Sequence, residues 1–568
     1  MELSVTAVST FAYGDRPTSL RVQRPGEPDL PIASGATYEP SGPLNHLDLG
    51  NGLTETRPTT NRYFPGAISV APTTPLSGAP VLQWAYGTDN VGNILTIDDA
   101  LTPANDKTYA YQDYQYFLKD GMGPWGHLIW TYDKIGNRLT EARDGVMDTY
   151  AYAPNAGTGH TALLESETPQ LGGARSYTCG PAGLLEHVEN PGNPVTFTSD
   201  DAGRLTRLER PAGDARSDFL CGGRSFLRWA EESSYSNLFS DGFETGDGRC
   251  WTLSEGSDIN AGTARCPLGD QIEVVYSSEG VLHTVTRHPL AAHESTRFYL
   301  YLAGCSVAQL DIDAAGIATP TWLTTDHLGT PVVATDAAGI SLWQGGFEPF
   351  GADYSGASLA GVDLRFPGQW VDGLRAGAGA GISSNGYRWF GSFEGRFSRP
   401  DPIGLNSCQR FKFGGLPPNR LYVYADNDPL GRFDSRGLKV EVCARPADLP
   451  VVGALGLPHK WIKTDTRSGG MGRANGEVPS QGQSDCPGIP TAVVDHSLQS
   501  GPDVKCMEVQ GLDQECVNKL IQPGRSTGPW VPAANDCWRF EDDVVSSCST
   551  RKPPFNPGRP GYRQSPLS

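Results

Sequence analysis

The residues best suited to chemistry stand in two short stretches, FSRPDPIGL (397–405) and FDSRGL (433–438), which share an aspartate, a spacer and Gly-Leu. Two carboxyl groups held close together cannot both stay ionised, so one keeps a proton and the other can act as a base toward water. If the fold brings Asp401 and Asp434 together, the pair predicts hydrolysis. In the other interpretation each aspartate only caps a turn.

A cysteine and a histidine in the last 130 residues form a second candidate site. The stretch NDCWRFEDDVVSSC (535–548) predicts a helix with Asn535 or Asp536 as its N-cap, which puts Cys537 in the first turn. There the helix dipole and the unpaired amides favour the thiolate, and the Cys537 amide can stabilise an oxyanion. His459 opens the strand-like run PHKWIKT and is the expected general base, then acid. The pair predicts a hydrolase for an amide, ester or thioester.

The third, orienting residue of this tail site stays open among Thr464, Asp465 and His496. Asp495-His496 also suits the core of a metal-dependent nuclease, although no second histidine stands at ligand spacing. Residues 439–568 hold 14 Lys+Arg and 14 Asp+Glu, and a neutral tail disfavours a nucleic-acid substrate. Neither site requires a cofactor or a metal.

Cysteine usage supports a structural alternative for Cys537. Half of the 12 cysteines stand in the tail, a density typical of disulfides or of disulfides plus one reactive thiol. Cys537 would then be half of a bridge, for example with Cys548. A metal site is the weaker interpretation, because no C-x-x-C or H-x₃-H pair is present. The six tail cysteines are Cys443, Cys486, Cys506, Cys516, Cys537 and Cys548.

A short repeat along the first part of the chain predicts the elements that position these residues. In the copy YDKIGNRLTEARD, Asp133 can accept hydrogen bonds from amides two or three residues on, and Gly136 can take a positive φ. The alternation that follows predicts a strand with one buried face. One hairpin cannot bury that face alone, so neighbouring hairpins must stack. The clearest copies begin near Thr88, Tyr132, Tyr177 and Ser199.

Composition agrees with a mainly β protein. The chain has 568 residues with 69 Gly and 45 Pro, which suits many short strands joined by tight turns. A formal charge of −19 argues against a surface that coats nucleic acid. We expect no signal peptide and no transmembrane segment, because no basic start and no long apolar run is present. An insert contains Asp241, Glu244 and Asp247, which suit Ca²⁺ or, more simply, a solvated acidic turn.

At this level of detail the chain resembles the RHS/YD-repeat family over roughly residues 80–438. The resemblance is carried by the repeats and by the ordered motifs TTDHLGTPVVATDAAG, GGFEPFGADY, LRFPGQW, NGYRWFGSFEGRFSRPDPIGL and NRLYVYADNDPLGRFDSRGL. It implies a hollow shell of spiralled β-hairpins that encloses a C-terminal polypeptide. The tail is also similar, around NDCWRF, to circularly permuted papain-like hydrolases, in which histidine precedes cysteine.

The family resemblance implies a role for the paired aspartates. Asp401 and Asp434 match the family's two aspartate motifs, which implies cleavage of the chain after Leu438 by an aspartyl-type pair. Enclosure raises the effective concentration of the scissile bond. Arg396, in the GRF motif, is expected to orient a carboxylate or to stabilise the oxyanion. The sequence departs from the family at Ser435, where proline is usual, and in the extra residues NSCQRFKF of the spacer.

These observations predict an RHS-type effector of bacteria, delivered by a dedicated secretion system and used in competition between cells. Its expected partners are its own tail as enclosed cargo, a cognate immunity protein and a component of the secretion apparatus, with no nucleic acid for the shell. Two other interpretations are a shell with a metal-dependent nuclease tail and a non-enzymatic adhesion module. The expected segments are an irregular or β segment 1–80, a repeat shell 81–371 with an insert at about 236–270, an autoproteolysis region 372–438, and a small α+β effector domain 439–568.

Overall fold

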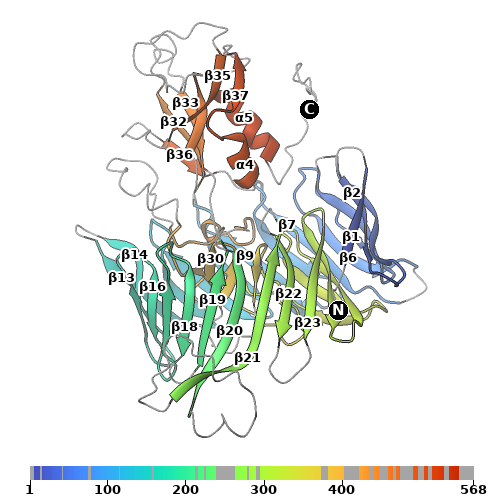
Figure 1. Ribbon diagram of the computed structural model, residues 1–568, viewed down its shortest axis with the longest axis horizontal. Helices are drawn as coiled ribbons and strands as arrows, with labels where there is room; N and C mark the ends of the chain where they lie inside the picture. The colour runs from blue at the N-terminus through green and yellow to red at the C-terminus, as the bar shows by residue number, and fades with distance from the viewer. Residues whose placement is uncertain are drawn as a thin grey trace.

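The fold is seen in a computed structural model of the chain (Figure 1). It is mainly β, as the sequence predicts. The structure describes residues 5–548 apart from 13–15, 41, 75–77, 114, 156–158, 211–214, 223–225, 238–262, 278–280, 289–293, 372–381, 402–420, 435–440, 447–457, 465–467, 474–489, 497–504, 509–513 and 530–536.

One sheet of 27 strands takes up the first 344 residues, and each strand in it pairs antiparallel with the next along the chain. The strands expected from the repeats belong to this sheet, and so do the strands that precede residue 80. The strands are β1 (Thr6–Ala12), β2 (Arg16–Gln23), β3 (Leu30–Tyr38), β4 (Leu44–Leu49), β5 (Leu53–Thr56), β6 (Ala67–Pro72), β7 (Leu82–Thr88), β8 (Ile94–Asp99), β9 (Lys107–Tyr111), β10 (Leu118–Gly123), β11 (Gly126–Tyr132), β12 (Arg138–Arg143), β13 (Val146–Pro154), β14 (His160–Thr168), β15 (Arg175–Cys179), β16 (Leu185–Glu189), β17 (Val195–Ser199), β18 (Leu205–Arg210), β19 (Ala215–Cys221), β20 (Leu227–Asn237), β21 (Thr263–Tyr276), β22 (Leu282–His288), β23 (Ser295–Leu302), β24 (Cys305–Asp313), β25 (Ala318–Thr325), β26 (Pro331–Thr335) and β27 (Ser341–Gln344).

The repeat turns have the predicted chemistry. Oδ1 of Asp133 accepts hydrogen bonds from the amides of Ile135 and Asn137, both at 2.9 Å, and Gly136 has a φ of 88°. Asp200 makes the same turn, accepting from the amides of Ala202 and Arg204. A glycine is needed because the positive φ is costly for other residues. The turn therefore returns the chain antiparallel after each strand.

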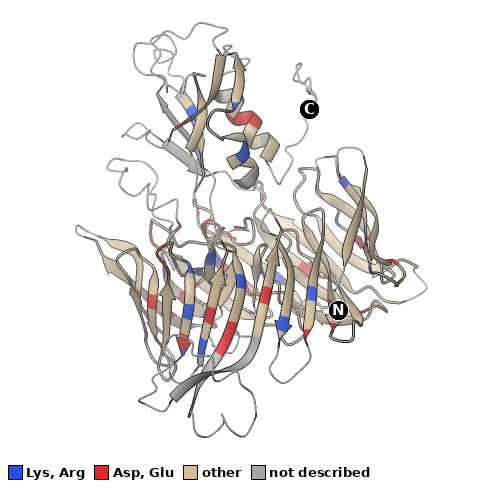
Figure 2. Cartoon of the chain, viewed as in Figure 1, with Lys and Arg blue, Asp and Glu red and all other residues tan. Residues whose placement is uncertain are grey.

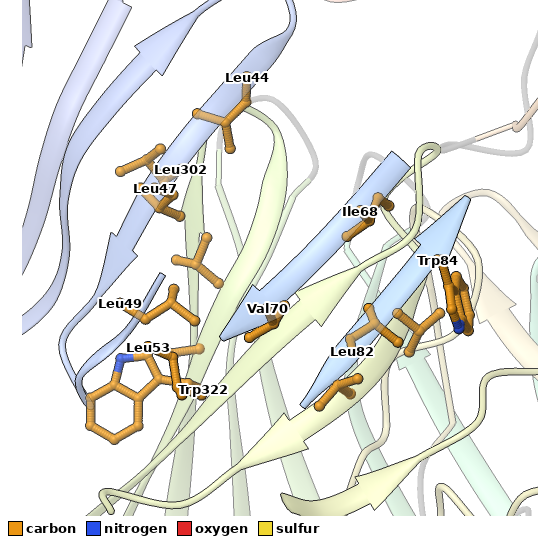
Figure 3. Close-up of a cluster of buried hydrophobic side chains, with 14 of the residues drawn as sticks. Leu44, Leu47, Leu49, Leu53, Ile68, Val70, Leu82, Trp84, Leu302 and Trp322 are labelled. Carbon is orange, nitrogen blue, oxygen red and sulfur yellow. The ribbon is translucent and has the colours of Figure 1, made fainter. Parts of the chain in front are cut away.

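The sheet curls until its first strands pack against its last ones. The indole of Trp322 on β25 donates to the Ile32 carbonyl on β3 at 2.9 Å, and Nδ2 of Asn51 donates to the Thr335 hydroxyl at 2.9 Å. Figure 3 shows the apolar side of this contact, with leucines of β4 and β5 beside Leu302 and Trp322. Burial of the apolar faces of the first and last strands against each other curls the twisted sheet into a wall with a concave side, called the hollow side below. Figure 2 shows acidic and basic residues interspersed along the wall strands.

A second, four-stranded sheet lies at the hollow side of the wall and comes from residues after 364. It consists of β28 (Gln369–Trp370), β29 (Ile382–Asn385), β30 (Arg388–Gly391) and β31 (Arg396–Phe397). Figure 1 places β30 behind the wall strands β18 and β19. Its aromatic core contains Phe366, Phe390, Phe397 and Tyr424.

The tail forms a third sheet of six strands with helices on one face. The strand order is β36-β32-β33-β34-β35-β37, and Figure 1 shows this sheet beyond one rim of the wall. No helix in the described residues is both long and apolar enough to span a membrane. The elements are β32 (Glu441–Pro446), β33 (Pro458–Lys463), β34 (Ser468–Arg473), β35 (Pro490–Asp495), β36 (Lys505–Glu508), β37 (Ser526–Pro529), α4 (Gln514–Leu520) and α5 (Cys537–Cys548).

Candidate functional site

The two aspartates of the DPIGL and DSRGL stretches meet at one arginine. Nη2 of Arg388 lies 2.6 Å from Oδ2 of Asp434 and 3.2 Å from Oδ2 of Asp401. The carboxylates come from positions 33 residues apart in sequence, yet both contact the same nitrogen. A single buried positive charge therefore bridges two carboxyl groups from distant positions of the chain.

The arginine and the two carboxyl groups are largely buried, and burying charged groups costs free energy of folding. The Arg388 side chain is fully buried, Asp401 is 1% exposed, and the Asp434 side chain is 12% exposed. The guanidinium stacks over the Phe397 ring at 3.5 Å from the centroid, and its Nη1 donates to the Leu421 carbonyl at 3.2 Å. Charges taken out of water must be paired and hydrogen-bonded. The contacts fix the guanidinium between the two carboxylates.

Arg388 takes the place that the sequence analysis gave to Arg396. Nη2 of Arg396 instead donates to the Ala162 carbonyl at 2.5 Å, and its guanidinium lies over the Tyr422 ring. Arg396 therefore fastens β31 to the wall. The sequence signal for Arg388 is the NGYRW turn, because Gly386 has a φ of 56° and Arg388 opens the returning strand opposite Asn385.

A left-handed turn leads from Tyr424 into Asp434. Ala425, Asp426 and Asn427 have φ values of 47°, 55° and 57°. This conformation costs about 1–2 kcal/mol for each residue other than glycine, so neighbouring contacts must hold it. Asn427 is buried and donates from Nδ2 to the Gly136 carbonyl at 2.9 Å. The turn is thus bound to the wall on the way to the second carboxylate.

The segment that carries the pair is attached to the wall at three repeat turns. The carbonyl of Gly136 accepts from Asn427, the carbonyl of Gly183 accepts from the Tyr422 hydroxyl at 2.6 Å, and the carbonyl of Gly203 accepts from Arg399. All three glycines have a positive φ. A Cβ added at Gly183 would lie 2.5 Å from the Tyr422 hydroxyl, so only glycine leaves room for this contact. The repeat turns are therefore docking points for the segment that carries the two aspartates.

Asp428, six residues before Asp434 in sequence, is a further buried acid. Its carboxylate accepts from the Gly431 amide at 3.0 Å and lies 3.7 Å from Nε of Arg432. Burial raises the pKa of Asp428 from 3.8 to about 7, although Arg432 lowers it. The turn that precedes Asp434 thus contains a group that titrates near neutral pH.

In the tail, His459 contacts the histidine that the sequence analysis left as one of three orienting residues. Nε2 of His459 lies 2.9 Å from Nε2 of His496, and Nδ1 of His496 lies 2.9 Å from the Val494 carbonyl. A carbonyl only accepts, so Nδ1 of His496 carries the hydrogen and its Nε2 accepts from His459. This assignment leaves Nδ1 of His459 as the nitrogen able to take a proton.

The other two orienting candidates do not show this contact in the part of the tail that the structure describes. The Thr464 hydroxyl donates to Oδ1 of Asn518 at 2.5 Å, and Asp465 lies outside the described residues. His496 is 1% exposed and stacks with Trp461 and His459. Of the three candidates, His496 is therefore the one that the geometry favours.

The predicted helix that begins with Cys537 is present as α5, although the cysteine side chain itself lies outside the described residues. Nζ of Lys460 on β33 bonds Oε2 of Glu541 at 2.8 Å, which ties the first turns of α5 to the start of β33. His459 stands at the same end of β33 and, by strand alternation, faces His496 rather than Glu541.

The disulfide suggested as an alternative for Cys537 uses a different cysteine. Cys548 is bonded to Cys516, which joins the end of α5 to α4. Cys443 and Cys506 stand directly opposite each other on β32 and β36. The structural interpretation of Cys537 as the partner of Cys548 is therefore wrong.

Several predicted positions fall outside the described residues. They are the cleavage position Leu438, Ser435, the orienting candidate Asp465, and the acidic residues Asp241, Glu244 and Asp247 of the insert.

Comparison with known proteins confirms the resemblance to RHS-type toxins, although no protein-family model matches the chain. Over 393 residues it is 24% identical to the toxin protein Tse5 of Pseudomonas aeruginosa, which covers 64% of this chain and 27% of Tse5. Over 119 residues it is 37% identical to the double-stranded DNA deaminase toxin A of Burkholderia cenocepacia, covering 20% of this chain and 7% of that protein. The chain therefore spans about a quarter or less of these relatives.

Solved structures share the fold. The crystal structure of TcdB2-TccC3 matches with a TM-score of 0.56 and 15% identity, over 77% of this chain and 21% of that one. The Tc holotoxin pore of Photorhabdus luminescens matches with a TM-score of 0.55 and 15% identity, over 76% and 20% of the two chains. The predicted β shell is thus confirmed at the level of fold.

Proposed function

We propose that this chain is a toxin-delivery protein of the RHS type whose shell cuts its own backbone after Leu438. Asp401 and Asp434 would be the catalytic carboxylates, and Arg388 the cation between them. The observation that carries the proposal is the convergence of both aspartates on one buried guanidinium. Its support from relatives is that two of them are named as toxins.

The reaction follows from sharing one proton between the two carboxyl groups. The ionised carboxylate takes a proton from water, and the oxygen of that water attacks the carbonyl carbon of Leu438. The protonated carboxyl then gives its proton to the departing amide nitrogen of Lys439, and the C–N bond breaks. Arg388 keeps the ionised partner in place without water, which is what a preorganised site contributes.

For the released tail we propose a cysteine hydrolase in which Cys537 is the nucleophile, His459 the base and His496 the orienting residue. The hydrogen on Nε2 of His459 is directed at His496, so Nδ1 is the nitrogen that would take the thiol proton. The thiolate would attack a carbonyl carbon, and His459 would return the proton to the leaving group. The described part of the tail lies beyond one rim of the wall, so the expected enclosure of the tail is not seen in this structure. The shell would carry the tail until delivery to a competing cell.

Other tail chemistries have less support. The deaminase named among the relatives belongs to a class that needs a P-C-x-x-C zinc motif, and the tail has no C-x-x-C pair. A metal-dependent nuclease needs more ligands than the pair His459–His496. In the described residues no group of three or more His, Cys, Asp or Glu could hold a metal. The adhesion interpretation gives the paired carboxylates no function.

Intact-mass measurement tests the self-cleavage. The purified chain should split into two fragments at Leu438–Lys439, and Asp434→Asn should stay whole. Asp426→Asn is the matched control, because this nearby aspartate pairs with Arg432 rather than Arg388. A single intact species from the wild-type chain would contradict the proposal.

Growth of a host that produces the full chain tests the tail. Cys537→Ala should remove toxicity if the tail is a cysteine hydrolase, and Cys516→Ala, which only opens the bridge, should leave part of it. Toxicity that survives Cys537→Ala but not His496→Ala would favour the nuclease. No toxicity in any form would favour the adhesion module.

A further inference from the structure

A second pair of acidic side chains lies where the hairpin β30–β31 meets the wall. Glu394 stands in the loop of that hairpin, and Glu167 stands on β14. The hydroxyl of Tyr177, on β15, lies 2.9 Å from Oε2 of Glu167 and 3.2 Å from Oε1 of Glu394. Tyr177 and Glu167 are buried. One hydroxyl therefore bridges two carboxyl groups from different parts of the fold.

The Tyr177 hydroxyl has too few hydrogens to bond two ionised carboxylates, so Glu394 must carry a proton. A tyrosine hydroxyl has one hydrogen and can donate it to only one of the two carboxyl groups. Glu167 also accepts from Nη1 of Arg175 at 3.2 Å, so it is the ionised partner and takes the Tyr177 hydrogen. Glu394 then fits the hydroxyl oxygen only as an acid that donates to it. Without its proton, the Glu394 carboxylate would be repelled by the lone pair of the Tyr177 oxygen and by the negative charge of Glu167.

The surroundings of Glu394 favour the same protonation state. Burial and then the nearby Glu167 raise the pKa of Glu394 above its ordinary value, and a backbone hydrogen bond, Arg175 and the Tyr177 hydroxyl each lower it by less. Glu394 also lines an apolar cavity between the wall and the hairpin, together with Leu164 and Phe197. The charged or titratable groups around it are Arg138 and Glu141 on β12, Tyr150 on β13, Glu167 on β14, Arg175 and Tyr177 on β15, and Arg396 on β31.

We propose that Glu394 is a positioning residue for the self-cleavage, a protonated acid that fastens the hairpin carrying Arg388 to the wall. The inference rests on the self-cleavage proposed above. Arg388 opens β30, and Phe397, on which its guanidinium stacks, closes β31. A shift of the hairpin away from Tyr177 would therefore move the guanidinium relative to Asp401.

The fastening should weaken as the pH rises. The raised pKa of Glu394 means that the folded chain keeps this proton at pH values above 4.5, where the unfolded chain has lost it. The stabilisation is therefore complete at low pH and is lost as the pH passes through the raised value. The cleavage rate should decrease over the same interval.

A comparison of the wild-type chain with Glu394→Gln tests the inference, because glutamine keeps the shape and a donor but does not titrate. Each full chain is collected unfolded in urea, diluted into buffers from pH 5 to pH 9, and followed by gel and intact mass. The two rates should agree at pH 5, and the wild type should fall behind by roughly tenfold at pH 9, the effect of one buried hydrogen bond. Every other pH-dependent step of the cleavage is common to both chains and cancels in the ratio.

Two further variants sharpen the test. Glu165→Gln, an exposed site on β14, should follow the wild type at every pH. Tyr177→Phe keeps the ring and removes the bridge, so it should be slower than the wild type at pH 5 and match it at pH 9.

The outcomes separate the two proposals. If the wild type and Asp401→Asn both stay whole, the self-cleavage is refuted. If the wild type splits and Asp401→Asn does not, but both the Glu394→Gln and the Tyr177→Phe ratios are constant from pH 5 to pH 9, only the role of Glu394 is overturned. Should Glu394→Gln fail to fold, the Tyr177→Phe ratio decides alone.

Discussion

Arg388→Met is the sharpest test of how the paired aspartates are held, because methionine fills the space of the side-chain stem without its charge. The guanidinium is fully buried and lies 2.6 Å and 3.2 Å from the two carboxylates. Removing one partner of a buried ion pair costs about 3–5 kcal/mol, because it leaves an uncompensated charge. If that cost falls wholly on the cleavage step, at about 1.4 kcal/mol for each factor of ten, we expect cleavage to slow by about 10²- to 4 × 10³-fold.

Two assays measure this loss. The split fraction is followed over time by intact mass, and urea unfolding of the uncleaved chains is followed by tryptophan fluorescence. Asp434→Asn is the reference for unfolding, because it stays whole and keeps the Arg388–Asp401 contact. At pH 7 Arg388→Met should be less stable than this reference by about 3 kcal/mol. The deficit should shrink toward pH 4, where protonation removes the unpaired negative charge.

Arg388→Lys provides a graded control, since lysine keeps the charge but not the fork that reaches two carboxylates and the Leu421 carbonyl. Its cleavage rate should fall between those of the wild type and Arg388→Met. The reasoning is refuted if Arg388→Met splits at the wild-type rate, or if it unfolds at the same urea concentration as Asp434→Asn.

Three other predictions concern the tail and the turn before the pair. Cys516→Ser opens the bridge to Cys548, whose 32-residue separation corresponds to about 3–4 kcal/mol of loop entropy, so the tail should unfold at lower urea concentration. Burial raises the pKa of Asp428 from 3.8 to about 7, so the folded chain favours the protonated carboxyl and loses stability as the pH rises through 7 and this group ionises. Asp428→Asn cannot ionise, so it should raise the Tm at pH 8 and change it little below pH 4. Gly470→Ala would put a Cβ within 2.9 Å of Cε1 of His496, so it should disturb the histidine pair and lower toxicity in a growth assay.

Each of these has a result that would count against it. A Cys516→Ser chain whose unfolding midpoint equals that of the oxidised wild type would contradict the loop-entropy estimate. An equal Tm gain for Asp428→Asn at pH 4 and pH 8 would show that ionisation is not the cause. Full toxicity of Gly470→Ala in a folded chain would show that the histidine contact is not needed.

Local chemistry explains why the wall could be predicted from the sequence. The hydrogen bonds of Asp133 and the positive φ of Gly136 are made within five residues, and the same pattern recurs along the chain. A hairpin with one apolar face then needs neighbours, which fixes the architecture. Only the family resemblance predicted the curling of the sheet. The contact of Trp322 with Ile32 joins residues 290 positions apart, and such a long-range contact leaves no local pattern in the sequence.

Long-range pairing explains what the sequence analysis missed at the site. Arg396 stood out because it lies five residues from Asp401, yet the β29–β30 turn and the pairing of β30 with β31 bring Arg388 there instead. His496 was set aside as a ligand because no second histidine stood nearby in sequence. The β34–β35 pairing brings it to His459, 37 residues away.

The segment that carries Asp401 and Asp434 is attached to carbonyls of the repeat turns at Gly136, Gly183 and Gly203, so the spacing of the hairpins determines where the two aspartates are held. Adding or deleting a hairpin before Gly136 would lengthen or shorten the container and leave these anchors in step. The same change between Gly136 and Gly203 would displace one anchor by two strand spacings, about 10 Å. The number of hairpins can therefore change mainly on the N-terminal side of Gly136 without moving the two aspartates relative to their anchors.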